Sequence, residues 1–104
     1  MKTLDQLPIP IDRERIAQFC RERGIRKMSL FGSVVRDDFD PERSDVDVLV
    51  EFAPHALEGV GWDYFGYGEE LEQIIGRKVD FCSRLNKYVW PFVKNELTPI
   101  YEQA

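Results

Sequence analysis

Asp45 and Asp47 are the residues with the clearest chemical potential in this chain, because a single valine separates the two acids. From residue 45 to residue 52, valine or phenylalanine occupies every second position, and this alternation predicts a strand. Residues i and i+2 of a strand point the same way, with Cα atoms roughly 6.5–7 Å apart. Aspartate is a poor strand former, so a pair of neighbouring carboxylates on one strand indicates a function.

A third acid, Asp80, lies between Val79 and Phe81 in a short apolar run that predicts another strand over 78–82. If both strands belong to one sheet, Asp45, Asp47 and Asp80 converge. Two like charges about 5 Å apart repel by roughly 3 kcal/mol at an effective dielectric near 20. Divalent cations offset such repulsion, and Mg²⁺ prefers carboxylate, water and phosphate oxygens. We therefore expect these three aspartates to hold metal.

Gly32 and Ser33 follow the strand predicted over 26–31, where the chain is expected to turn into a helix. Glycine lets the backbone approach a ligand closely, and unpaired N–H groups at such a turn can hold phosphate. Arg36 lies three residues further on and is expected to reach the same anion. A phosphate-binding turn beside metal-binding acids is the minimal equipment for phosphoryl or nucleotidyl transfer.

The remaining elements predict an α+β fold, a small mixed β-sheet flanked by helices, in a single domain over 1–104. Residues 1–11, with two prolines, are predicted to form an extended arm. Asp12 and Gly24 mark the two ends of a predicted helix over 13–23. Further helices are expected over 69–75 and 91–97, and an edge strand is expected over 98–101.

Composition excludes several classes of protein. The 104 residues carry a net charge of −5, and seven acids with one base fall between residues 37 and 51. This charge argues against direct nucleic-acid binding through phosphates. We expect no membrane segment, since no window reaches the roughly 18–20 apolar residues that a span requires. The absence of a signal-peptide pattern and the widely spaced Cys20 and Cys82, read as free thiols, favour a cytoplasmic protein.

Three segments together resemble a known family. They are Phe31-Gly32-Ser33-Val34-Val35-Arg36, Ser44-Asp45-Val46-Asp47-Val48-Leu49-Val50 and Gly76-Arg77-Lys78-Val79-Asp80. This combination resembles the signature of the minimal nucleotidyltransferases, which belong to the DNA polymerase β-like nucleotidyltransferase superfamily. The resemblance spans residues 25–80 and implies the nucleotidyltransferase fold.

The resemblance also implies roles for individual residues. Gly32, Ser33 and Arg36 would bind the triphosphate of ATP. Asp45 and Asp47 would hold two Mg²⁺ ions, for which Mn²⁺ can substitute, and Asp80 would complete the shell of the catalytic metal and help to activate the incoming hydroxyl. Small members of the family act as antitoxins of HEPN-domain toxins, and the best understood transfer AMP from ATP to a tyrosine of the toxin.

The leading hypothesis is therefore an ATP- and magnesium-dependent adenylyltransferase that modifies a partner HEPN toxin. One alternative is an antitoxin that neutralises its partner by binding and occlusion without catalysis. Another is a nucleotidyltransferase for a small molecule. The aromatic cluster Trp62, Tyr64, Phe65 and Tyr67 is expected in the core or at a partner interface, so a homo- or hetero-oligomer remains open.

Overall fold

The computed structural model describes residues 7–36, 38–85 and 87–103. Its centre is a four-stranded sheet in the order β3-β2-β1-β4. The strands are β1 (Ile25–Phe31), β2 (Val46–Phe52), β3 (Val79–Cys82) and β4 (Thr98–Glu102). Strand β1 pairs antiparallel with both β2 and β4, whereas β2 and β3 run parallel. The sheet is therefore mixed, and the predicted α+β fold class is confirmed.

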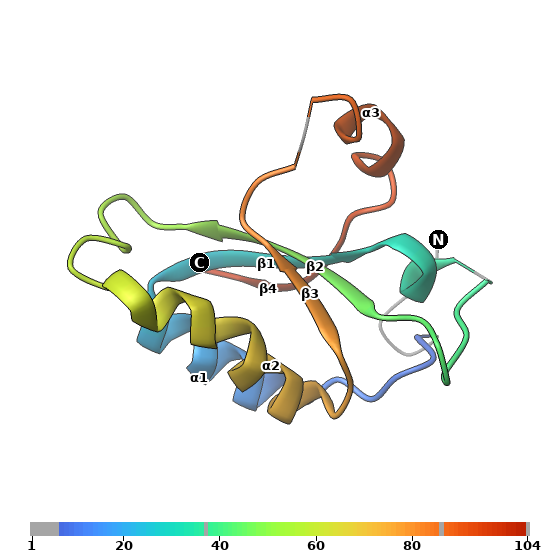
Figure 1. Ribbon diagram of the computed structural model, residues 1–104, viewed down its shortest axis with the longest axis horizontal. Helices are drawn as coiled ribbons and strands as arrows, with labels where there is room; N and C mark the ends of the chain where they lie inside the picture. The colour runs from blue at the N-terminus through green and yellow to red at the C-terminus, as the bar shows by residue number, and fades with distance from the viewer. Residues whose placement is uncertain (1–6, 37, 86, 104) are drawn as a thin grey trace.

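Helices α1 (Arg13–Arg23) and α2 (Tyr67–Ile75) lie together on one side of the sheet (Figure 1). The Asp12 side chain caps α1 by accepting a hydrogen bond from the Arg15 backbone N–H at 3.2 Å. Gly24 ends α1 with a φ of +70°, a left-handed conformation that glycine adopts at little cost. The helix predicted over 13–23 thus has the expected bounds and caps.

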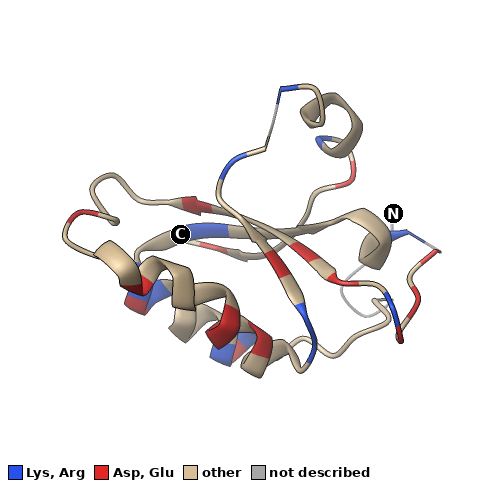
Figure 2. Ribbon diagram, in the orientation of Figure 1, with Lys and Arg blue, Asp and Glu red and all other residues tan. Residues whose placement is uncertain are grey.

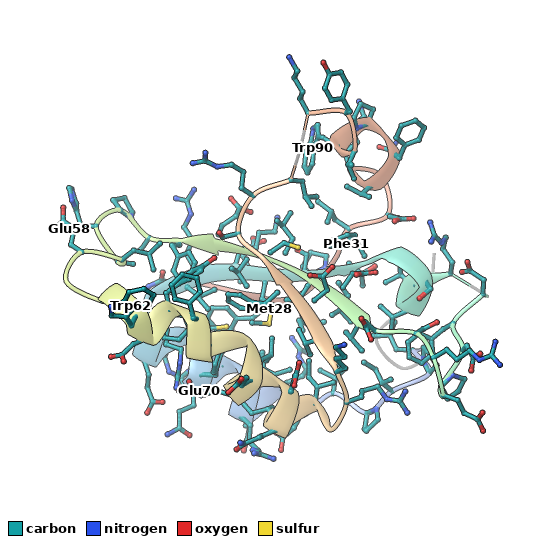
Figure 3. The ribbon with its side chains drawn as sticks, viewed as in Figure 1. Met28, Phe31, Glu58, Trp62, Glu70 and Trp90 are labelled. Atoms are coloured by element: carbon teal, nitrogen blue, oxygen red, sulfur yellow. The ribbon has the colours of Figure 1, made fainter. Side chains whose placement is uncertain are left out.

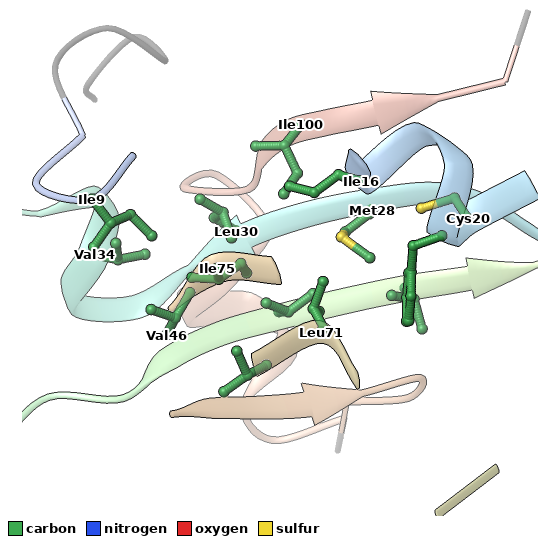
Figure 4. Packing of buried hydrophobic residues seen from close by; sticks show 14 of the residues in the cluster. Ile9, Ile16, Cys20, Met28, Leu30, Val34, Val46, Leu71, Ile75 and Ile100 are labelled. Carbon is green, nitrogen blue, oxygen red and sulfur yellow. The ribbon is translucent and has the colours of Figure 1, made fainter. Parts of the chain in front are cut away.

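The core lies between these two helices and the sheet (Figure 4). From the sheet, Val46, Val48 and Val50 of β2 are fully buried. The same cluster contains Met28 and Leu30 of β1, Ile16 and Cys20 of α1, and Leu71 and Ile75 of α2. Because strand side chains alternate between faces, the burial of the valines directs Asp47 toward the opposite face.

Among residues 7–36, 38–85 and 87–103, no long helix lies on that opposite face, and the short helix α3 (Trp90–Val93) projects on its side (Figure 1). Figure 3 shows Phe31 on the α3 side of the sheet and Met28 on the side of α1 and α2. Phe31 and Val93 are buried but do not belong to the main core cluster. The segment between β3 and β4 therefore partly covers the face that carries Asp47.

Several predicted boundaries differ from those observed. Strand β2 begins at Val46, whose N–H bonds to the Lys78 carbonyl at 2.9 Å, so Asp45 lies just outside it. Helix α2 begins at Tyr67 rather than at residue 69, because Tyr67 is buried with its ring packed edge-on against Phe19. The helix predicted over 91–97 is the single turn α3.

The predicted extended arm over 1–11 is only partly within the described residues, which begin at residue 7. Residues 7–9 form bends, and Leu7 and Ile9 are buried in the core. Burial of these two apolar side chains favours packing against the domain over an extended arm. None of the described helices is long and apolar enough to cross a membrane.

Candidate active site

Asp47 on β2 and Asp80 on β3 occupy directly opposite positions in the parallel ladder. In a parallel pair, residues in register share a face, so both aspartates lie on the sheet face away from α1 and α2. On the other side of Asp47, its partner on β1 is the buried Phe31. Figure 2 shows acidic positions on the neighbouring strands β2 and β3. The predicted approach of acids from two separate strands is thus present for Asp47 and Asp80.

The environment of Asp47 disfavours its charged form. Burial is the largest cause that raises the pKa of the Asp47 carboxyl, followed by the negative charges of Asp80 and Asp45. Arg36 opposes this effect and Glu96 adds to it, and the resulting pKa is about 6 instead of 3.8. A carboxylate destabilised in this way gains most from a cation placed beside it.

Asp45 is positioned by the loop that precedes β2. In this loop the Ser44 backbone N–H donates to the Asp40 carbonyl at 2.8 Å, and the Ser44 Oγ accepts from the Asp40 N–H at 2.9 Å. Arg77, which precedes β3, donates to the Pro41 carbonyl at 2.8 Å. These bonds tie the loop to itself and to the start of β3, so part of the acidic segment has a structural role.

Gly32 begins the single 3₁₀ turn Gly32–Val35 that follows β1. Its φ is +76°, and a Cβ at this position would lie 3.1 Å from the Asp47 Cγ and closer still to the Asp47 Oδ2. Only glycine allows the backbone of the turn to approach the carboxylate this closely. The turn and the aspartates, which the sequence indicated separately, are therefore adjacent in space.

Arg36 and Glu96 complete the surroundings of the turn. The Arg36 backbone N–H bonds to the Ser33 carbonyl at 3.1 Å, and the exposed Arg36 side chain pairs with Asp38 and Glu96, each at 3.4 Å. The Glu96 Oε1 accepts a hydrogen bond from the Gly32 N–H at 3.0 Å. Sequence reasoning did not identify Glu96, because no local pattern links it to a turn more than sixty positions earlier.

The carboxylate oxygens of this region are hard donors of the kind that Mg²⁺ and Mn²⁺ prefer. Within the described ranges, however, no three His, Cys, Asp or Glu side chains are grouped so that they could hold a metal ion. Asp45 influences the pKa of Asp47, but Asp45, Asp47 and Asp80 do not form the closed cluster that the sequence predicts. The donor chemistry of Asp47 and Asp80, which lie opposite each other, suits a divalent cation.

Cys82 lies two positions after Asp80, with its Sγ 3.8 Å from the Asp80 Oδ1. Burial, followed by the negative charge of Asp80 and the hydrogen bond to it, raises the pKa of the Cys82 thiol to about 11. Cys82 and the buried Cys20 are both free thiols, as expected. A protonated thiol is a poor nucleophile and metal ligand, so the reactive groups of this face are its carboxylates.

Comparison with known proteins agrees with the geometry. Residues 13–99 match the nucleotidyltransferase domain family. The chain therefore belongs to the nucleotidyltransferase domain family, which confirms the predicted resemblance at the level of that family. A search of curated proteins found no match.

Among solved structures, a similar fold occurs in a crystal structure described as a mutant of the toxin-antitoxin MntA-HpeT. The TM-score is 0.62 and the sequence identity 14%, and the similarity covers 89% of this chain and 75% of the other. At this identity the likeness shows a common fold.

Proposed function

We propose that this chain is an ATP-dependent adenylyltransferase that transfers AMP to a tyrosine hydroxyl of a partner HEPN toxin and thereby acts as its antitoxin. The observation that carries the proposal is the placement of Asp47 opposite Asp80, directly beside the Gly32 turn, in a nucleotidyltransferase domain. The acids and the anion-binding turn come from separate segments, and nucleotidyl transfer is the chemistry that needs both.

In this proposal the turn orients the nucleotide. The Gly32 N–H and the Arg36 guanidinium hold phosphate oxygens, with Ser33 as a further donor. The same Gly32 N–H and Arg36 side chain bind a carboxylate in the present structure, that of Glu96, which supports their capacity to hold an anion. Binding of this kind aligns the α-phosphate with the acceptor and reduces the entropic part of the barrier.

Asp45, Asp47 and Asp80 would hold two divalent cations, Mg²⁺ or Mn²⁺, which neutralise the charge that builds up on the phosphate oxygens. The acceptor oxygen forms a bond to the α-phosphorus of ATP. The bond from that phosphorus to the oxygen shared with the β-phosphate breaks, and pyrophosphate leaves. Asp80 takes the proton of the hydroxyl and passes it to water, so the product is a phosphodiester between AMP and the tyrosine.

A partner supplies the acceptor in this proposal, and two features support that role. The similar fold occurs in the structure of a toxin-antitoxin pair. Large aromatic side chains are also exposed, with Trp62 and Phe65 on the 3₁₀ segment Gly61–Gly66 and Phe92 on α3. Aromatic residues are enriched in protein interfaces. The cluster predicted in the core or at a partner interface is divided, because Tyr67 is buried whereas Trp62 and Phe65 are exposed.

The proposal is tested by incubating the protein with ATP labelled in the α-phosphate, Mg²⁺ and the product of the adjacent gene. We expect label on the partner, and loss of at least about 100-fold in rate for the Asp45→Asn/Asp47→Asn variant. The control is Glu14→Gln, which changes an exposed acid of α1, on the other side of the sheet, and should leave labelling unchanged. An unlabelled partner, or equal labelling by the double variant, contradicts the proposal.

The second candidate is an antitoxin that acts by occlusion without catalysis. The observation that favours it is the exposure of Trp62, Phe65 and Phe92, large apolar side chains that can contact a partner without any reaction. A cell-survival assay separates the two candidates. The double variant protects cells from the toxin if occlusion suffices, and it fails to protect them if transfer is required.

A further inference from the structure

Glu96 places a carboxylate at the anion-binding turn of this protein. Its Oε1 accepts the Gly32 N–H at 3.0 Å, and its Oε2 lies 3.4 Å from an Arg36 guanidinium nitrogen. The Glu96 side chain is only 13% exposed, whereas that of Arg36 is 53% exposed. Both oxygens of one carboxylate are thus engaged by the donors that an incoming anion would need.

Glu96 also lies close enough to the candidate active site to act on one of its acids. Glu96 is one of the negative groups that act on Asp47, together with Asp80 and Asp45. Since like charges repel, the contacts of Glu96 with Gly32 and Arg36 must compensate its repulsion by Asp47. The position of Glu96 is explained if the Gly32 N–H and Arg36 form an anion site that the Glu96 carboxylate occupies.

We propose that Glu96 is an intramolecular competitor of the nucleotide: its carboxylate occupies the Gly32–Arg36 anion site, and the triphosphate must displace it in order to bind. This inference rests on the proposed function, because it assumes that the turn binds ATP. The Gly32 N–H is a single donor, and Glu96 already holds it. The apparent affinity for ATP is therefore the intrinsic affinity multiplied by the fraction of time for which Glu96 leaves the site free.

Displacement of Glu96 would also change the segment that carries it. The Glu96 N–H donates to the Val93 carbonyl of α3 at 3.0 Å, and the Glu96 carbonyl accepts from the Thr98 hydroxyl of β4 at 3.2 Å. Trp90 begins α3 and is 42% exposed, so it reports on this segment. The other tryptophan, Trp62, lies on the Gly61–Gly66 segment and can be replaced by phenylalanine to leave one fluorophore.

The test measures the affinity of the full chain for ATP with Mg²⁺, by calorimetry, in the wild type and in Glu96→Gln. Glutamine keeps the shape of the side chain and removes its charge, so we expect binding about five- to tenfold tighter. The matched control is Glu102→Gln, which removes an exposed glutamate of β4 that pairs with Lys27 and should bind ATP as the wild type does. Glu96→Asp, with a carboxylate one carbon shorter, is a second variant that should also tighten binding.

Inorganic tripolyphosphate without metal tests the same competition at the turn alone, and there too Glu96→Gln should bind more tightly. In the Trp62→Phe variant, ATP should change the fluorescence emission of Trp90. The Trp62→Phe/Glu96→Gln variant should already show part of that change without ATP. If the wild type binds ATP and both Glu96 variants bind it equally well or more weakly, the inference about Glu96 is wrong and the proposed function is unaffected. Failure of every form to bind ATP overturns both.

Discussion

Asp47 and Asp80 lie opposite each other in the only parallel strand pair among the described residues. Gly32, directly after β1, lies against the Asp47 carboxylate. Backbone hydrogen bonds of the sheet fix this relationship, so it does not depend on a flexible loop. Two acids held in register repel each other. The repulsion between these two acids therefore destabilises the folded protein. Such an arrangement is typical of sites that bind a cation together with an anionic substrate.

The raised pKa of Asp47 makes a prediction about stability. The unfolded chain has the ordinary pKa of 3.8 and the folded chain a pKa of about 6, so the folded state binds more protons between these values. The free energy of unfolding therefore falls as the pH rises through this interval. In the presence of a chelator, Asp47→Asn should be more stable than the wild type at pH 7 by about 1–2 kcal/mol, which is below the full conversion of the shift because Asp47 is partly exposed.

Thermal unfolding between pH 4 and pH 8 measures this effect. The gain in Tm for Asp47→Asn should be about 5–10 °C at pH 7 and should shrink toward pH 4, where the wild-type carboxyl is also neutral. Asp63→Asn provides the control, with no comparable gain. A variant that is less stable at pH 7, or a gain that is the same at pH 4, contradicts the charge explanation.

Local patterns predicted much of this molecule. Strand β2, the capped helix α1 and strand β3 are all observed. Each was predicted from residues close together in the sequence: the alternation in β2, the two caps of α1, and the apolar neighbours of Asp80 in β3. Where tertiary packing decides the outcome, prediction was less accurate. Tyr67 extends α2 because its ring is buried against Phe19, and Leu7 joins the core. Neither contact leaves a signal in the neighbouring sequence.

The candidate site shows the same division. The sequence identified Asp47, Asp80 and Gly32, and the structure places them together. It did not identify Glu96, whose contact with Gly32 depends on how the segment between β3 and β4 crosses the sheet face. Asp45 was predicted inside the strand and lies just before it, because the ladder to β3 starts at Val46.

Gly32→Ala should be more damaging than the same change at Gly59. Both glycines have a φ of +76°, so alanine meets a similar backbone penalty at each. A Cβ at Gly59 meets nothing within 4 Å, whereas at Gly32 it collides with the Asp47 carboxylate. We expect a loss of about 1 kcal/mol for Gly59→Ala and about 2 kcal/mol more for Gly32→Ala, measured by urea unfolding.

A double-mutant cycle identifies the cause of that difference. If the collision with Asp47 is responsible, Asp47→Ala should recover part of the stability that Gly32→Ala loses. Strictly additive effects of the two changes, or equal losses at Gly32 and Gly59, would show that the turn does not press against Asp47.

The reactivity of Cys82 reports on the charge of Asp80. Because burial and Asp80 together raise the pKa of the thiol to about 11, Cys82 should react slowly with iodoacetamide at pH 8. Asp80→Asn removes the charge and should speed the reaction several-fold. Cys20 is buried and should stay unreactive in the folded protein. An unchanged rate in Asp80→Asn would show that the two side chains are further apart than the structure has them.

Divalent cations should stabilise the protein through these acids. A ligand that binds only the folded state at ten times its Kd adds about 1.4 kcal/mol, so Mg²⁺ or Mn²⁺ should raise Tm by several degrees. Asp47→Asn/Asp80→Asn should lose this response and Asp63→Asn should keep it. If the double variant responds to metal as the wild type does, the cations bind elsewhere.

The position of the label in ATP tests the central claim most directly. The product of the adjacent gene, proposed above to be a partner toxin, is incubated with the wild-type chain, Mg²⁺ and ATP labelled either in the α- or in the γ-phosphate. We predict that the toxin acquires the α-label, that the γ-label leaves with pyrophosphate, and that Asp47→Asn transfers neither. Transfer of the γ-label would indicate phosphoryl transfer instead, and transfer of neither label by the wild type would contradict the account of Asp47 and Asp80 as a nucleotidyl-transfer site.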